Sequence, residues 1–323
     1  MNFRELGKTG VNISEISLGC WTMGGLNWVN GVPNGWANVD EKEISNAINY
    51  AIDMGVNHFD NADVYGNGRA ERMLARILGN KTNDMIIATK IGWFPGTAEY
   101  VYHPTHIRHQ CEQSLINLKR DYIDLYYFHH GDFGENYKYL DAAIEEMYKL
   151  KAEGKIRFIG QSAYKHEDFV HIVPKLKPDA LQSWAHAMDY KFIADETPTR
   201  KLLDEYKMSF IAFSPLAQGL LLDKYNKENP PQFEPGDFRL NSPKFAKDNL
   251  GAIEPKVNEI KKHFGSSVED LARAAQQFLL KFDVVGAVIP GFRNLNQVKV
   301  NLAAIDKPLT DDEFNLVKKI FSN

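Results

Sequence analysis

The segment HFDNADVYGNGRAE, residues 58–71, joins a run typical of a β-strand to a run typical of an α-helix. The same alternation extends over the whole chain. We expect eight strands, at residues 13–19, 57–62, 85–91, 124–129, 156–162, 180–184, 209–214 and 285–291. Helices are expected between them, among others at residues 41–54, 70–78, 106–118, 140–152 and 271–281. Eight such units favour a parallel (β/α)8 TIM barrel over the rival doubly wound open sheet, because each parallel neighbour needs a crossover of this length.

The composition is that of an ordinary globular protein, with 44% hydrophobic and 25% charged residues among 323. No linker or shift in composition divides the chain, so we expect residues 1–323 to form a single α/β domain. The net charge of −4 is small and evenly spread, which argues against nucleic acid or an anionic membrane as a partner. A small molecule or another subunit is the expected partner, and no pattern indicates an oligomeric state.

A cytoplasmic location is expected from the N-terminus and the cysteines. The start MNFRELGKTG lacks the apolar region of a signal peptide, and no apolar run reaches the length of a membrane span. Cys20 and Cys111 match no metal-binding spacing and no disulfide framework, which fits a reducing compartment.

Two irregular stretches, residues 24–40 and residues 226–245, follow the first and seventh expected strands. The second is rich in proline and too long for a plain turn, so we interpret it as a functional loop. In a (β/α)8 barrel both would lie at the carboxyl ends of the strands, where active sites are built.

Four chemically useful side chains follow successive strands. Asp60 and Tyr65 come at the end of the second strand, Lys90 at the end of the third, and His129 at the end of the fourth. An ammonium group stabilises a tyrosine anion, a carboxylate holds the lysine, and a histidine can orient a substrate oxygen. This combination predicts a proton-transfer site for a carbonyl or an alcohol. His130 points to the opposite face of the strand from His129, so at most one of them reaches the barrel mouth.

Several motifs, in this order, resemble the aldo-keto reductase family. RELGKTGVNISEISLGCW resembles its N-terminal hairpin and first strand, FDNADVYGNGRAE its FDTAxxYGxGxSE signature, and DYIDLYYFHH its DYxDLYxxH segment. GKIRFIGQS resembles GKIRxIGVSN, and FSPLAQGLL and VIPGFRNLNQVKVN resemble two cofactor-binding segments. The resemblance covers nearly the whole chain. It implies a TIM barrel with an N-terminal β-hairpin and an NAD(P)H-dependent oxidoreductase that reduces aldehydes or ketones, or oxidises the matching alcohols.

The resemblance also implies roles for individual residues. Tyr65 is the proton donor or acceptor, Lys90 and Asp60 tune it, and His129 orients the carbonyl. The expected cofactor-binding residues are Trp21, Ser162, Gln182, Phe213, Ser214, Pro215, Leu216, Gly219, Lys224, Arg239, Gly291, Arg293, Gln297 and Asn301. Within this set, Ser162 and Gln182 bind the nicotinamide carboxamide and Phe213 stacks on its ring.

NADPH is favoured over NADH because of Arg293 and Arg239, which match positions near the 2′-phosphate and the loop that closes over the cofactor. Ala163 and Val300 depart from the family pattern, where an asparagine and a glutamate are common. Both departures concern the affinity and orientation of the cofactor more than the chemistry.

Aromatic residues in the loops predict the walls of an apolar substrate pocket, with Trp21, Trp93 and Phe133 as the main candidates. For Trp28 and Trp36, packing within a loop is an equally good interpretation. No metal is expected, because the histidines of HPTHIRH, residues 103–109, fit an exposed helix start better than a metal site.

The sequence also leaves three alternative interpretations. A cofactor-sensing binding subunit with little turnover is the main alternative, since some barrels of this family serve membrane channels. A barrel hydrolase or isomerase would need a second acid at a strand end. A dinucleotide cradle at Gly66 and Gly68 would need a third glycine where Glu71 stands.

Overall fold

A computed structural model of the chain describes residues 1–303 and 305–322. Among these residues, eight parallel strands form one sheet in sequence order. They are β3 (Leu18–Gly19), β6 (His58–Asp60), β7 (Ile86–Ile91), β8 (Ile123–Phe128), β9 (Ile156–Ser162), β10 (Ala180–Trp184), β11 (Ser209–Phe213) and β12 (Val285–Ile289). Parallel bridges from Ile16 to Val288 and from Gly19 to Gly291 close the sheet on itself. The expected (β/α)8 barrel is therefore confirmed, and the open-sheet alternative is wrong.

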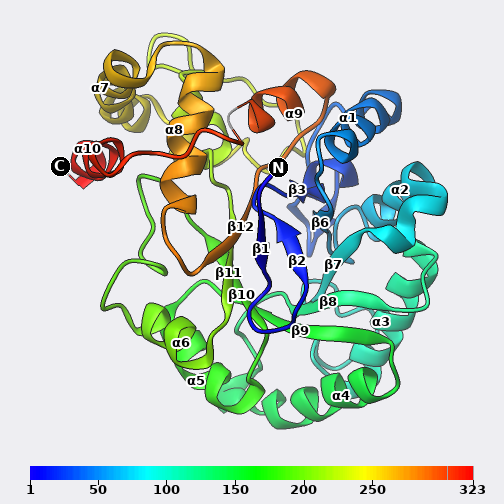
Figure 1. Cartoon of the computed structure of the whole chain (residues 1–323). Helices are drawn as coiled ribbons and strands as arrows, with labels where there is room; N and C mark the ends of the chain where they lie inside the picture. The colour runs from blue at the N-terminus through cyan, green and yellow to red at the C-terminus, as the bar shows by residue number, and fades with distance from the viewer. Residues whose placement is uncertain (304, 323) are drawn as a thin grey trace.

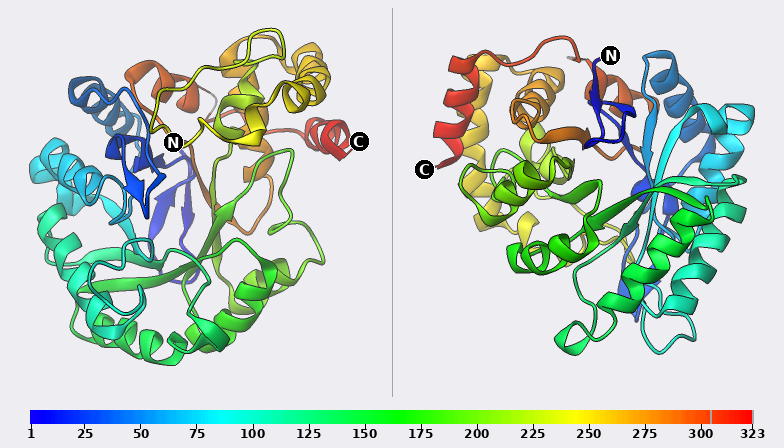
Figure 2. Two further views of the ribbon diagram at one scale, coloured as in Figure 1. Left: turned by 180° about the vertical axis from the view of Figure 1, so that it is seen from behind. Right: turned by 60° about the horizontal axis from the view of Figure 1, so that its bottom comes forward.

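Helices form an outer layer around this sheet (Figures 1 and 2). They are α1 (Glu41–Asp53), α2 (Arg69–Leu78), α3 (Pro104–Leu118), α4 (Leu140–Ala152), α5 (His166–Leu176), α6 (Pro198–Tyr206), α7 (Lys247–Phe264), α8 (Val268–Leu280), α9 (Leu295–Leu302) and α10 (Asp311–Ser322). Short 3-10 helices lie in the connections: η1 (Cys20–Gly24), η2 (Gly79–Asp84), η3 (Glu135–Tyr137), η4 (Ala217–Leu222) and η5 (Pro243–Phe245). No helix in the described part of the chain has the combination of length and apolar character that spanning a bilayer needs.

The N-terminal hairpin is present and covers one end of the barrel. Its strands β1 (Phe3–Glu5) and β2 (Asn12–Ser14) are antiparallel. Leu6 and Ile13 are buried in one cluster with barrel residues such as Leu125 and Ala180, and Figure 1 shows the hairpin lying across the sheet. The expected continuous strand at residues 13–19 is therefore wrong. Its first residues pair with β1 in the hairpin, and its later residues, from Ile16 onward, join the barrel. A single run of strand-forming residues is thus divided between two sheets.

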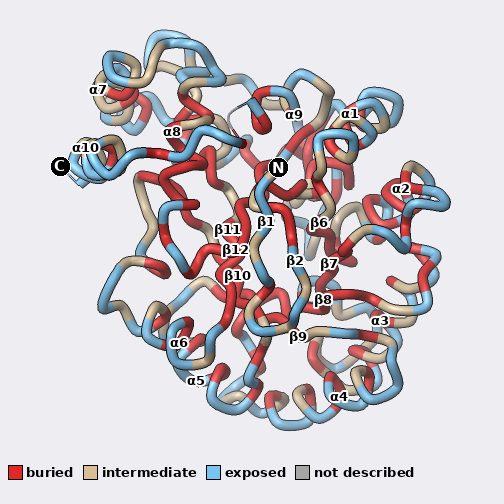
Figure 3. Tube along the Cα trace, viewed as in Figure 1, coloured by how far each residue is buried: buried red, intermediate tan, exposed pale blue. Residues whose placement is uncertain are grey.

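Burial follows the layers. Every residue of β7 and β8 is buried, because helices cover the outside of the sheet and side chains fill its inside. Figure 3 shows the barrel strands mostly as buried and the outer sides of the helices as exposed. Polar residues at the strand ends are therefore conspicuous, since they lie in an otherwise apolar interior.

Local signals in the sequence explain the helix boundaries. The expected helix at 106–118 begins earlier, at Pro104, because proline is favoured in the first turn. The expected helix at 271–281 begins at Val268, because Ser267 and Asp270 form a capping box. The expected strands at 156–162 and 180–184 agree with β9 and β10. A short ribbon of β4 (Trp28–Val29) and β5 (Val32–Pro33) lies in the loop after β3.

Arg4 ties the hairpin to the barrel. Its guanidinium donates hydrogen bonds to the carbonyl oxygen of Leu280 at 2.6 Å and to that of Val285 at 2.7 Å, and it pairs with Glu15 at 2.6 Å. Leu280 is the last residue of α8, so the cation lies where helix carbonyls lack partners and the helix dipole favours positive charge. The side chain is 27% exposed, which limits screening by solvent.

We predict that Arg4→Ala lowers the free energy of unfolding by about 2–3 kcal/mol, because several charge-assisted hydrogen bonds are lost together. Urea denaturation followed by circular dichroism measures the change. Arg76→Ala is the matched control, since Arg76 and Glu41 form an exposed ion pair whose loss costs less than about 1 kcal/mol. Equal losses in the two variants would contradict this role of Arg4.

Candidate active site

A buried ion pair lies at the carboxyl ends of β6, β7 and β10. The Nζ atom of Lys90 donates to Oδ2 of Asp60 at 2.6 Å and to the carbonyl oxygen of Asn61 at 2.6 Å. The other carboxylate oxygen, Oδ1, accepts a hydrogen bond from Nε2 of Gln182 at 2.8 Å. Lys90 is completely buried. Removing two charges from water is costly unless they are paired and fully hydrogen-bonded, and this arrangement provides both.

Tyr65 and His129 lie beside this ion pair. The Nζ atom of Lys90 is 5.2 Å from the centre of the Tyr65 ring, and the rings of Tyr65 and His129 lie 5.9 Å apart, edge to face. The structure thus brings together the four residues that the sequence placed at successive strand ends. Gly66 makes the sharp turn possible: its φ is +62°, and a Cβ atom there would collide with the carbonyl oxygen of Gly24.

The protonation states of these two groups follow from burial. Burial raises the pKa of the Tyr65 phenol well above its usual value, and the charge of Asp60 and the phenol of Tyr164 raise it further. Burial lowers the pKa of His129 well below its usual value, and the charges of Lys90 and His130 act in the same direction. Near neutral pH the phenol is therefore protonated and the imidazole is neutral. Among the described residues, none forms a hydrogen bond with Nδ1 of His129.

His130 has a structural role in the same region. Its Nε2 atom donates to the carbonyl oxygen of Gly92 at 2.6 Å, and its Nδ1 atom accepts from the backbone amide of Asp132 at 3.2 Å. The hydroxyl group of Tyr102 bridges the backbone N–H and C=O of His130 at 2.9 Å each. These bonds join the loops that follow β7 and β8.

Aromatic rings extend from the proton-transfer residues in both directions. Trp21 stacks on Tyr65 with a centroid distance of 6.1 Å, and Trp93 lies 6.1 Å from His129. Tyr164, which the sequence analysis did not select, continues the row at 6.4 Å from Trp93. Its position two residues after Ser162, just past the end of β9, was the available signal.

Phe133, which the sequence predicts in the wall of the substrate pocket, packs against other aromatic rings. Phe133 is completely buried, and its ring packs against Tyr102 at 4.4 Å and Phe128 at 5.0 Å. It belongs to the core beneath the loop after β8. An aromatic residue in a loop can face inward as readily as outward, and the sequence alone does not separate the two cases.

Most of the expected cofactor-binding residues lie along one side of the barrel mouth. Ser162 is the last residue of β9, Gln182 lies in the middle of β10, and Phe213 is the last residue of β11. The backbone turns sharply just after β11, with φ of +56° at Ser214 and +96° at Gly219. Further members of this set follow in the same segment or surround the start of α9: Pro215, Leu216, Lys224, Gly291, Arg293, Gln297 and Asn301.

Two features of this side suit a nicotinamide nucleotide. Across residues 1–303 and 305–322, no hydrogen-bond partner reaches the buried Oγ atom of Ser162, so this hydroxyl is free to bond a carboxamide. Arg293 is partly buried beside the N-terminus of α9, which Asn294 caps. Its guanidinium donates to the carbonyl oxygen of Ala37 at 3.2 Å. A helix N-terminus with a neighbouring arginine favours a phosphate.

Arg239 is held by an ion pair on its own loop. Its guanidinium pairs with Asp237 through Nε at 2.9 Å and Nη2 at 2.8 Å. It also lies over the rings of Trp36 and Phe233. These contacts hold the guanidinium of Arg239 against the loop after β3, and its role toward the cofactor stays a prediction. The paired N–H donors of a guanidinium suit a phosphate and a carboxylate equally well, and here they bind the carboxylate of Asp237 on the same loop.

The connector at residues 58–71 also carries two buried acids with other roles. Glu71 accepts hydrogen bonds from Thr89 Oγ1 at 2.6 Å and from Asn117 Nδ2 at 2.8 Å, which ties α2 to β7 and α3. Asp63 is buried, and in the described structure neither of its carboxylate oxygens has a hydrogen-bond partner. Burial raises the pKa of Asp63 well above its usual value, and the nearby charge of Glu71 adds to this effect.

No metal site accompanies these residues. Within the described ranges, no group of three histidine, cysteine, aspartate or glutamate residues could hold a metal ion. His106, one of the histidines considered from the sequence, forms a hydrogen bond with the carbonyl oxygen of Phe94 at 2.7 Å.

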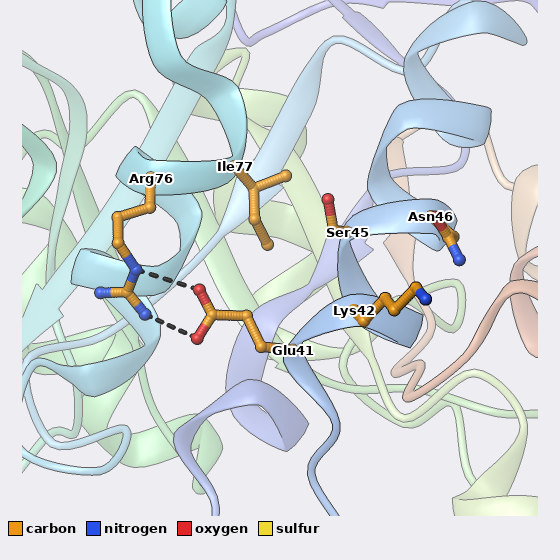
Figure 4. A pocket seen from close by; sticks show the side chains of 6 residues that line it. All are labelled: Glu41, Lys42, Ser45, Asn46, Arg76 and Ile77. Atoms are coloured by element: carbon orange, nitrogen blue, oxygen red, sulfur yellow. Dashed lines mark hydrogen bonds and ion pairs between the residues drawn. The ribbon is translucent and has the colours of Figure 1, made fainter.

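A groove of about 440 Å³ lies between α1 and α2, away from these residues (Figure 4). It is lined by Glu41, Lys42, Ser45, Asn46, Arg76 and Ile77. Figure 4 shows that Glu41 and Arg76 face each other across it, and their ion pair at 2.8 Å satisfies both charges. It contains none of the proton-transfer residues, so the candidate active site lies at the barrel mouth.

A parallel barrel that gathers a phenol, a buried lysine–carboxylate pair and a neutral imidazole at its strand ends has the parts of an oxidoreductase for carbonyl or alcohol groups. A sequence model described as the aldo/keto reductase family matches residues 15–321, and the chain belongs to this family. The resemblance seen in its motifs is thereby confirmed.

Individual relatives agree with this placement. The oxidoreductase YqkF of Bacillus subtilis (strain 168) is 27% identical over 325 residues, covering 98% of this chain and 96% of its own. A probable voltage-gated potassium channel subunit beta of Arabidopsis thaliana is 28% identical over 316 residues, covering 95% and 92%. The solved structure of a glycerol dehydrogenase from Gluconobacter oxydans has a TM-score of 0.81 and 27% identity, covering 99% and 95%.

We predict that Asp63→Asn changes the pH dependence of stability. A carboxyl group whose pKa is raised on folding stabilises the protein fully below its unfolded pKa and loses that contribution as the pH rises toward the folded pKa. The asparagine variant lacks this loss. Its free energy of unfolding, relative to the unchanged protein, should therefore rise between pH 4 and pH 8.

Urea denaturation at several pH values measures this difference, with the exposed Asp121→Asn as the matched control. A difference that stays constant with pH would show that Asp63 is not the group responsible.

Proposed function

We propose that this oxidoreductase transfers hydride between a nicotinamide nucleotide and a small carbonyl or alcohol substrate, with Tyr65 as the proton donor to the carbonyl oxygen. The observation that carries the proposal is the buried pair of Lys90 and Asp60 beneath the Tyr65 ring, with His129 alongside. The raised pKa of Tyr65 keeps the proton on the phenol until a substrate oxygen develops negative charge.

The other members of the group each have a separate task. When Tyr65 gives up its proton, the ammonium group of Lys90 stabilises the phenolate. Asp60 holds that ammonium in place, and Gln182 in turn holds Asp60. The neutral imidazole of His129 can donate a hydrogen bond to the substrate oxygen and so fix its orientation.

A bound nicotinamide nucleotide supplies or accepts the hydride in this chemistry. Ser162 and Gln182 would hold its carboxamide and Phe213 its ring, as the family pattern implies. Ser214, Pro215, Leu216, Gly219 and Lys224 would approach its pyrophosphate, and Gly291, Gln297 and Asn301 its adenosine. Ala163 lacks a side-chain amide at this place, so the orphaned hydroxyl of Ser162 carries more of the task here.

NADPH is the proposed cofactor rather than NADH. Arg293 supports this choice, because burial and the neighbouring charge of Arg239 lower its pKa and so disfavour an uncompensated cation at this position. A phosphate group would relieve that cost. With Arg239 paired to Asp237, Arg293 is the residue proposed to bind the 2′-phosphate.

We also propose that residues 1–323 form a single domain that works in the cytoplasm. The hairpin packs with barrel residues in one buried cluster, and the terminal helix α10 packs with barrel residues in another. Cys20 and Cys111 are both buried and unlinked, which suits a reducing compartment.

We predict that Tyr65→Phe lowers kcat for carbonyl reduction at least about a hundredfold, because a general acid contributes that much or more. The Kd of NADPH, measured by tryptophan fluorescence, should stay within about twofold, since the phenol is not expected to hold the nucleotide. Tyr148→Phe, on the outer helix α4, is the control and should retain full activity.

Survival of turnover in Tyr65→Phe would remove the proton-donor assignment. If the unchanged protein binds NADPH tightly but oxidises it with none of a panel of aldehydes and ketones, the alternative of a cofactor-sensing subunit is favoured instead.

We predict that Arg293→Ala weakens NADPH binding at least about tenfold and leaves NADH binding within about twofold, because a charge-assisted bond to phosphate is lost. Fluorescence titration with each nucleotide gives the two Kd values. Lys299→Ala, in the helix α9 that follows Arg293, serves as the control for a general loss of positive charge. A parallel loss for both nucleotides would show that Arg293 does not read the 2′-phosphate.

A further inference from the structure

Two loops that are distant in sequence meet beside the candidate active site. Gly35, in the loop after β3, forms a parallel bridge with Asp237, in the loop after β11. The backbone N–H of Phe238 donates to the carbonyl oxygen of Gly35 at 2.9 Å, and the backbone N–H of Ala37 donates to Oδ2 of Asp237 at 3.3 Å. We refer to residues 35–37 together with residues 237–239 as the clasp.

The clasp is anchored by a buried ion pair. Asp237 and Arg239 are 1% and 6% exposed, and two nitrogen atoms of the guanidinium bond the carboxylate. The guanidinium carbon lies 4.3 Å from the ring centre of Trp36 and 4.1 Å from that of Phe233. Burial alone would raise the pKa of Asp237, but the hydrogen bonds and charge of Arg239 outweigh burial and lower it. Because the guanidinium of Arg239 is paired, stacked and buried, residues 237–239 have little conformational freedom.

The residue between the two partners is different in character. Phe238 is 39% exposed, although both of its neighbours in sequence are buried. Its ring packs on Trp21 with a centroid distance of 4.9 Å. Trp21 in turn packs on Trp36 at 5.4 Å and stacks on Tyr65 at 6.1 Å. An exposed aromatic ring held rigidly by buried neighbours is therefore placed one ring away from the proposed proton donor.

We propose that Phe238 is a specificity-determining residue that forms the Trp21 side of the substrate site and favours carbonyl substrates with a flat apolar group, such as an aryl aldehyde. The inference rests on the proposed function. Aromatic rings gain by edge-to-face and offset contacts with one another, which a small aliphatic aldehyde does not provide. Asp237 is a positioning residue, because it acts on the substrate through the placement of Phe238.

The first test compares two substrates in one variant. Phe238→Ala should lower the ratio of kcat/KM for benzaldehyde to kcat/KM for propanal by about fivefold or more, mainly through a higher KM for benzaldehyde. The Kd of NADPH should stay within about twofold. Leu240→Ala is the matched control, since Leu240 is 44% exposed on the same loop and should leave the ratio unchanged.

The second test asks whether Asp237 acts through Phe238. Asp237→Asn keeps the shape of the side chain and removes its charge, so the ratio should fall in the same direction. The double variant Asp237→Asn/Phe238→Ala should show a ratio no lower than that of Phe238→Ala alone, because residues that act as a unit are not additive. A general loss of folding would lower both rates together without this pattern.

The outcomes separate this inference from the function beneath it. An unchanged ratio in Phe238→Ala, in a protein that reduces both aldehydes, overturns the specificity role alone. A further drop of the ratio in the double variant overturns the positioning role of Asp237. Unchanged protein that oxidises NADPH with no carbonyl overturns the proposed function, and with it the inference.

Discussion

The ion pair between Lys90 and Asp60 is the interaction on which the rest of the site depends. Two charges inside a barrel are tolerated only when each finds its full set of partners. Lys90 therefore needs Asp60 and the carbonyl oxygen of Asn61, and Asp60 needs Gln182 from the far side of the barrel. These bonds fix the relative positions of β6, β7 and β10. Tyr65 lies over the lysine because the connector turns directly above this pair.

The connector from His58 to Glu71 combines a chemical and a structural task. Asp60 and Tyr65 belong to the proton-transfer group, whereas Glu71 binds Thr89 and Asn117 and so fixes the start of α2 against its neighbours. The glycines between them allow the backbone to pass close to Gly24. A third glycine at position 71 would complete a dinucleotide-binding motif. Glu71 stands there instead, and its hydrogen bonds hold α2 to β7 and α3. A rigid connector keeps the phenol of Tyr65 at a fixed distance from the ammonium group of Lys90.

The sequence predicted the barrel and the four central residues well, because both follow from periodicity. Strand ends recur at one face of a barrel, so an acid, a lysine and a histidine at successive ends must converge. Contacts between loops do not follow any regular spacing in the sequence. The pairing of Arg239 with Asp237 is between near neighbours on a loop whose path no pattern specifies, so the sequence did not predict it. The burial of Phe133 and the position of Tyr164 beside Trp93 were not predicted for the same reason, since a loop residue faces inward or outward according to tertiary packing. The division of residues 13–19 between two sheets was hidden because a single β-branched run satisfied both.

The closure of the barrel has a consequence for its motions. β3 contributes two residues, and isolated bridges rather than a full ladder join this side to β12. Few backbone hydrogen bonds hold this joint, so we expect local opening to begin there and its amides to exchange with solvent before those of β7 and β8. Polar contacts span the joint: Arg4 reaches the β12 side, and Arg293 bonds Ala37. A nucleotide held by Arg293 and reaching toward Tyr65 would itself bridge the joint. Binding of the nucleotide and local opening of the barrel at the joint would then be coupled equilibria.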